Sequence, residues 1–138
     1  MAGKIGRVIV RSDKSRPTAP SHLDLYGLMD NTSTNLLRPL LNAELAVGRK
    51  NFILDFGGIS GIWVCEEMLF EIIQLGRLVH EVGGKVFLVK APHTMVEKLN
   101  GMGIRASLFD DLFSVVDEES IAVTAIKSVR TPNGGEAA

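Results

Sequence analysis

The sequence has very little cysteine and no long hydrophobic run. Cys65 is the only cysteine among 138 residues, which excludes an internal disulfide and any metal site built on several thiolates. No stretch approaches the ~18 consecutive apolar residues of a membrane-spanning helix, and residues 1–6 lack the apolar core of a signal peptide. We therefore expect a cytoplasmic protein without direct membrane insertion.

An excess of charge of one sign is also missing. The net charge is −1 and the signs are interspersed, so the sequence offers no basic patch for nucleic acid. The histidines His22, His80 and His93 lie far apart, without the i, i+4 spacing of a helical metal site. We expect no nucleic-acid partner, no metal and no cofactor. With 46% hydrophobic and 22% charged residues, the remaining composition is typical of a globular domain.

Short apolar runs and helical periodicities predict an α/β domain. Strands are predicted from β-branched or alternating runs at Arg7–Arg11, His22–Tyr26, Asn51–Phe56, Lys85–Lys90 and Leu112–Val116. Apolar residues at helical spacing predict helices from near Leu36, from Cys65 to Val82, from Pro92 to Leu99 and from Glu118 to Val129. Strands that alternate with helices favour parallel neighbours joined by right-handed crossovers. We expect a flexible N-terminus at residues 1–6, one domain at 7–129 and a flexible tail at 130–138.

The most apolar strands and the central helix predict the core. We expect one shared core, formed by Leu25, Ile53, Leu54, Met68, Ile72, Val79, Val86 and Leu88.

A glycine-rich segment follows the third predicted strand. Gly57–Gly61 reads as a loop before a helix, where backbone N–H groups can hold a phosphate. The segment fits neither the dinucleotide-binding pattern nor the P-loop, so a plain loop is the simpler interpretation and nucleotide binding the alternative. Ser60 misses the nucleophile-elbow pattern by one residue and has no plausible base, since the three histidines are scattered over different elements. We therefore expect no enzyme.

The only tryptophan stands in the predicted loop before the second long helix. Tryptophan is over-represented where proteins contact partners, although the ring of Trp63 could equally fold over the strand ends. Glu66 and Glu67 add negative charge at the start of the helix, where the helix dipole favours it. These features predict a partner-binding surface at Trp63, Val64, Cys65, Glu66 and Glu67.

Four motifs occur in a recognisable order along the chain. They are Leu25–Asp30 (LYGLMD), Phe52–Ile59 (FILDFGGI), Gly83–Val89 (GGKVFLV), and Gly103-Ile104 followed by Leu112–Asp117 (LFSVVD). Together they resemble the STAS domain, the domain of anti-sigma factor antagonists. The resemblance implies a mixed sheet of four or five strands with about four helices packed mainly on one side. It also implies a protein partner, namely an anti-sigma factor or serine kinase, or another STAS protein, and a possible homodimer.

The phosphorylation motif of that family is absent. Switching STAS proteins carry D-S-S/T-G at the start of the second helix, whereas the matching positions here, Trp63–Glu66, contain no hydroxyl. The resemblance therefore implies a constitutive, non-catalytic binding or scaffold subunit in bacterial signalling and transcription regulation. Nearby hydroxyls that could substitute as phosphorylation sites are Ser60, Thr32, Ser33 and Thr34. A soluble subunit that regulates a membrane transporter is the alternative.

Overall fold

A five-stranded mixed sheet forms the centre of the molecule. The computed structural model describes residues 6–16, 18–101 and 106–118. The strands are β1 (Arg7–Arg11), β2 (Ser21–Met29), β3 (Phe52–Ile62), β4 (Val86–Val89) and β5 (Phe113–Val116), in the spatial order β1-β2-β3-β4-β5. The helices are α1 (Asn31–Thr34), α2 (Leu37–Ala46), α3 (Glu66–Glu81), α4 (His93–Asn100) and α5 (Ala106–Leu112). The predicted α/β class and mixed sheet are confirmed.

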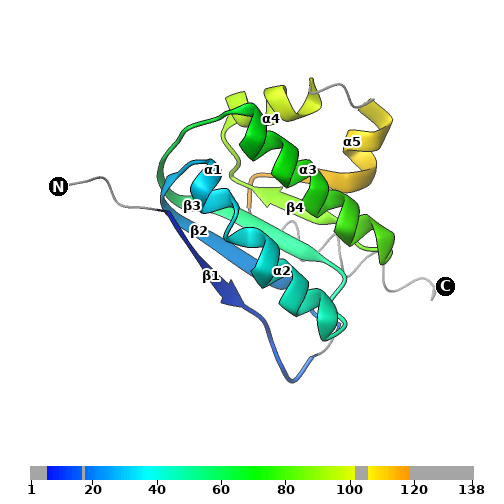
Figure 1. Cartoon of the computed structure of the whole chain (residues 1–138). Helices are drawn as coiled ribbons and strands as arrows, with labels where there is room; N and C mark the ends of the chain where they lie inside the picture. Colours follow the sequence, from blue (N-terminus) through cyan, green and yellow to red (C-terminus); the bar gives the residue numbers. More distant parts are fainter. Residues whose placement is uncertain (1–5, 17, 102–105, 119–138) are drawn as a thin grey trace.

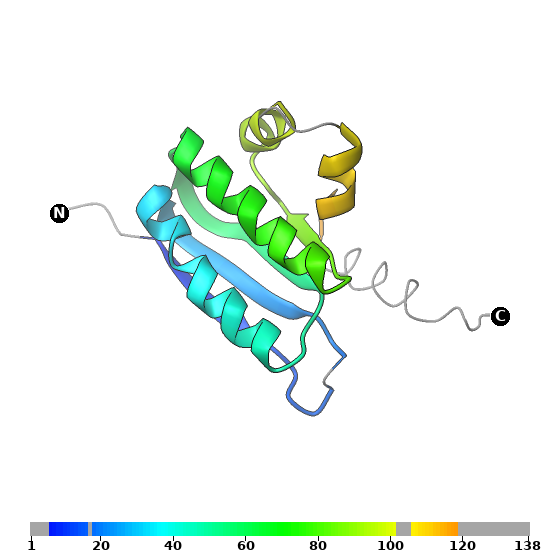
Figure 2. The ribbon, with the colours of Figure 1, turned by 45° about the vertical axis from the view of Figure 1, so that its right-hand side comes forward.

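The described helices cover one face of the sheet (Figure 1). β1 pairs with β2 in antiparallel orientation, and each later strand adds in parallel on the same side of the preceding one. Right-handed crossovers place their helices on the same face as long as the strand order does not reverse. α2 and α3 accordingly lie side by side over the strands, as the rotated view in Figure 2 also shows.

The main core lies between the helices and the sheet. Seven of the eight residues predicted to share it do so, among them Leu54 of β3 and Met68 of α3. Ile53 is the exception, because successive residues of a strand point to opposite faces. It packs with Phe87 and Val89 in a smaller cluster on the face opposite the helices. The prediction of a single core was therefore wrong for Ile53.

The predicted glycine loop is part of β3. β2 continues to Met29, three residues beyond the predicted end, and its pairing with β3 extends the sheet to Ile62. Gly58 is needed in this register because a Cβ there would lie 2.4 Å from the Tyr26 ring. The prediction of a loop at Gly57–Gly61 was wrong, and with it the alternative of a phosphate-holding loop, since these residues belong to a strand paired with β2.

The ends of the elements follow local chemistry. Asp30 caps α1, because its Oδ1 accepts a hydrogen bond from the Ser33 amide at 2.9 Å. α2 begins at Leu37, which leaves Pro39 in the first turn, where its missing N–H costs nothing.

The helix α5 was not predicted from the sequence. Gly6, expected in a flexible N-terminus, is buried against the end of β2. The helix predicted from Glu118 to Val129 lies outside the described residues beyond Glu118.

Candidate functional site

The segment between β3 and α3 lies at the carboxyl end of the parallel strands. The Trp63 amide donates a hydrogen bond to the Met29 carbonyl at 2.8 Å, which holds this segment beside the end of β2. Cys65 then occupies the N-cap position of α3 in extended conformation. The Trp63 side chain is 70% exposed. Of the two orientations considered for this ring, the structure has the outward one.

The first turn of α3 presents negative charge. Glu66 and Glu67 are both exposed, and Glu67 Oε1 accepts a hydrogen bond from Asn31 Nδ2 at 3.3 Å. The Glu66 side chain forms no hydrogen bond or ion pair with another described residue, so its carboxylate is available to a partner. Behind this turn, Arg38 of α2 binds both carboxylate oxygens of Glu71, at 2.8 and 2.9 Å, and fixes α2 against α3. The interhelical ion pair also raises the pKa of Arg38, through its hydrogen bonds to Glu71.

Phe70 extends the predicted surface by one helical turn. The residue is 58% exposed, and it lines a shallow hollow of about 530 Å³ with Glu66, Glu67 and Gly101. A second hollow of about 430 Å³ is lined by Val64, Cys65, Glu66, Leu69, Lys98 and Gly101. Sequence analysis missed Phe70, although its place on the polar side of the predicted helix, one turn after Glu66, was the signal. We call Trp63–Glu67 together with Phe70 the α3 amino-end surface.

The four hydroxyls considered as phosphorylation sites differ in accessibility. Ser33 and Thr34 are buried, and their hydroxyls donate to Asp30, at 3.1 Å to Oδ1 and 2.8 Å to the carbonyl oxygen. A kinase cannot reach a buried hydroxyl in the folded protein, which argues against both residues. Thr32 and Ser60 are exposed.

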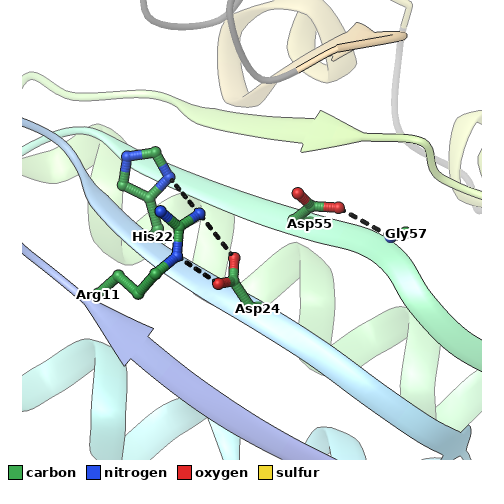
Figure 3. Close-up of polar contacts among 5 residues, drawn as sticks. All are labelled: Arg11, His22, Asp24, Asp55 and Gly57. Carbon is green, nitrogen blue, oxygen red and sulfur yellow. Dashed lines mark hydrogen bonds and ion pairs between the residues drawn. The ribbon is translucent and has the colours of Figure 1, made fainter.

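A polar cluster lies on the face opposite the helices (Figure 3). The Arg11 guanidinium forms an ion pair with Asp24, and Nη2 lies 3.2 Å from Asp24 Oδ1 and 3.3 Å from His22 Nδ1. Because guanidinium only donates, His22 Nδ1 is the acceptor in this contact. Asp55 is aligned with Asp24 on the neighbouring strand, and its Oδ1 accepts the Gly57 amide at 2.8 Å.

This cluster fastens β1 to β2 and offers no catalytic arrangement. Both oxygens of Asp24 are bound to Arg11, and neither aspartate faces a serine or cysteine nucleophile within the cluster. Across the described ranges, no group of three His, Cys, Asp or Glu side chains is arranged to hold a metal ion. Sequence analysis did not anticipate the cluster, because its members come from three strands whose register the sequence does not specify.

Comparison with known proteins identifies the fold. No protein-family model matches the chain, and no curated protein matches it in sequence. The anti-sigma factor antagonist SpoIIAA in its unphosphorylated form is similar in structure, with a TM-score of 0.62, 17% identity, and coverage of 89% of this chain and 97% of SpoIIAA. The protein TM1081 matches with a TM-score of 0.62 and 15% identity over 88% of each chain.

Part of a membrane transporter also matches. The murine anion transporter Slc26a9 gives a TM-score of 0.64 at 13% identity, covering 89% of this chain but only 22% of the transporter. At such identities the similarity concerns the fold, and the expected STAS-like fold is confirmed. None of these matched structures is described as an enzyme. Within the described ranges, none of the helices combines the length and apolar character that a bilayer crossing requires.

Proposed function

We propose that the protein is a non-catalytic STAS-type binding subunit that docks a protein partner through the α3 amino-end surface. The observation that carries the proposal is the exposure of two large aromatic side chains, Trp63 and Phe70, on either side of Glu66 and Glu67. Aromatic anchors of this kind supply most of the binding energy of many interfaces. In the free protein the apolar surface of both rings is in unfavourable contact with water. A partner that covers the rings removes this contact.

Charge specifies the kind of partner. Glu66 and Glu67 lie beside the aromatic rings, and no described cation forms an ion pair with either carboxylate. A partner with basic side chains around an apolar patch complements this surface and is steered toward it over a distance of about 8 Å at physiological salt. An anti-sigma factor or serine kinase, or another STAS protein, is the partner class that the resemblance favours.

The binding is constitutive. Positions 63–66 carry no hydroxyl, so a serine kinase has nothing to modify where switching STAS proteins are phosphorylated. We assign the protein to bacterial cytoplasmic signalling and transcription regulation as a scaffold that stays competent to bind. The described hollows are shallow, and the Cys65 thiol that lines one of them forms no hydrogen bond with the neighbouring Glu66 or Lys98 side chain, which supports a binding role.

Regulation of a membrane transporter is the second candidate. The similarity to part of Slc26a9, an anion transporter, favours it. The two candidates predict different partners, because a regulatory subunit is recovered with membrane protein and a signalling subunit with a soluble kinase or phosphatase.

Affinity capture from the source organism tests the proposal. The wild-type chain and the variants Trp63→Ala and Phe70→Ala serve as parallel baits, with Val47→Ala as the matched control. Val47 is 69% exposed but lies at the far end of α2, so its truncation removes exposed apolar area away from the α3 amino-end surface. We expect one partner to be captured by wild type and Val47→Ala and lost with both aromatic variants. Equal capture by all four baits would refute the assignment.

A further inference from the structure

Among the described residues, β3 has one edge without a partner over more than half its length. β4 pairs only with Phe52–Asp55, whereas β3 continues to Ile62. Figure 3 shows β3 bending away beyond the arrowhead of the lime strand β4, at the position of Gly57. Beyond Asp55, the described residues that pair with β3 all belong to β2. We call Gly57–Ile62 on the side of β4 the free edge of β3.

The free edge is accessible, and its first amide is satisfied locally. The Gly57 amide donates to the carboxylate of Asp55, two residues earlier in the same strand, in place of a neighbouring strand. Gly57, Gly58 and Ser60 are exposed, and the other residues of the free edge are partly exposed. A strand edge of this kind offers N–H and C=O groups to an added strand.

Two lysines that form no ion pair with another described residue flank the free edge. Lys90 follows β4 in left-handed conformation (φ 56°), and its Nζ lies 3.6 Å from the position that a Cβ on Gly57 would occupy. It lines a hollow of about 450 Å³ with Arg11, Asp24, Tyr26 and Asp55. At the other end, Lys98 of α4 lines the hollow beside Val64 and Cys65. Neither lysine side chain forms a hydrogen bond or ion pair with another described residue.

We propose that the free edge of β3 binds an extended peptide segment of another protein as an added strand, with acidic side chains near both ends of the segment. Main-chain hydrogen bonds would supply affinity and the two lysines specificity. At about 3.3 Å per residue, a strand that runs from Gly57 to Val64 spans about 23 Å, so the acidic side chains are about seven residues apart.

A second copy of this chain fits the free edge poorly. Antiparallel pairing of two copies would bring Lys90 of one toward Lys98 of the other, and juxtaposed like charges oppose association. An acidic peptide neutralises the same two ammonium groups. The site adjoins the α3 amino-end surface at Val64 and Cys65. It differs from that surface because it uses the backbone of β3 and does not require the side chains of Trp63 or Phe70.

Selection from a phage-displayed library of random 12-residue peptides tests the proposal. Selected peptides are synthesised and titrated into the labelled full chain, with amide chemical shifts as readout. We expect shared acidic residues about seven positions apart and shift changes centred on residues 56–62. N-methylation of alternate peptide residues should abolish binding, and methylation of the intervening residues should preserve it, because alternate amides of a strand face its partner.

Two variants separate charge from stability. Lys90→Gly removes the ammonium group and relieves the left-handed backbone, so a weaker affinity cannot result from unfolding. We expect Lys90→Gly and Lys98→Gln each to weaken binding about fivefold, the scale of one accessible ion pair, and Trp63→Ala to leave it unchanged. The proposal is overturned if no peptide is selected, if N-methylation has no alternating effect, if shifts centre on Trp63 and Phe70, or if the free edge mediates a concentration-dependent dimer.

Discussion

Gly76 in the middle of α3 permits close packing of that helix on the last strand. A Cβ at position 76 would lie 2.8 Å from Cζ and 3.1 Å from Cε1 of Phe113, and 3.3 Å from Cβ of Leu112. The Phe113 ring is buried and packs against Phe109 with ring centroids 5.4 Å apart, so it has little room to move. Gly76→Ala therefore has two opposite effects on the free energy of unfolding. Alanine is the better helix former, but its methyl group overpacks the core.

The magnitudes decide the sign. Alanine is about 1 kcal/mol better than glycine inside a helix, whereas overpacking a core costs about 1–3 kcal/mol. We expect Gly76→Ala to lower the free energy of unfolding by about 1 kcal/mol. Combined with Phe113→Leu, which removes the clashing ring atoms, the same change should become neutral or stabilising, with a coupling of about 1–2 kcal/mol.

The wild type, the two single variants and the double variant form a double-mutant cycle. Urea denaturation followed by far-ultraviolet circular dichroism measures the free energy of unfolding of each. Trp63 fluorescence is a poor probe, because the ring is already 70% exposed in the folded protein. If Gly76→Ala stabilised both the wild type and the Phe113→Leu variant by about 1 kcal/mol, helix propensity alone would explain its effect. That outcome would show that α3 and β5 are not packed as closely as described.

Three further predictions concern the loop before β2, the cap of α1 and phosphorylation. Arg49 is buried and donates to the carbonyls of residues 13, 16 and 19, so Arg49→Met should cost roughly 3 kcal/mol in urea denaturation, and a cost below about 1 would contradict this role. The Ser33 amide lowers the pKa of Asp30 below its ordinary 3.8, so the unfolded state takes up the proton first. Wild type should lose stability as the pH falls from about 3.8 through the folded pKa, and Asp30→Asn should lack that part of the loss in urea titrations between pH 2 and 5. Incubation with a serine anti-sigma kinase and ATP should leave residues 61–68 without phosphate, and stoichiometric phosphate on Ser60 by intact-mass and peptide mapping would restore a conventional switch.

The sequence was informative where periodicity was long and uninterrupted. α3 appears with the predicted buried side, because Met68, Ile72 and Val79 recur at helical spacing over sixteen residues. The parallel strands follow from the alternation of strands and helices. The STAS-like fold was predictable because its motifs lie in segments that the fold itself constrains.

The errors came from interactions between distant segments. Glycines at 57, 58 and 61 suggest a loop locally, but pairing with β2 keeps them in a strand, and Tyr26 covers Gly58. α5 has only seven residues, too few for a periodic signal. Phe70 was overlooked although its place on the polar side of the predicted helix, one turn after Glu66, gave a signal, because that side was interpreted from its charged residues alone. The free edge of β3 was not predicted, because it exists only where β3 continues beyond the end of β4, and the sequence does not specify the lengths of the two strands.

The most direct test of the proposed function is the affinity of the captured partner for Trp63→Ala and Phe70→Ala by surface plasmon resonance, beside thermal melts of each variant. With both rings exposed, we predict a loss of about 2 kcal/mol for Trp63→Ala, about thirtyfold in Kd, a smaller loss for Phe70→Ala, and unchanged melting temperatures. Val47→Ala should bind as wild type does. Unchanged affinity in both aromatic variants, with folding intact, would contradict the account and place the interface elsewhere on the domain.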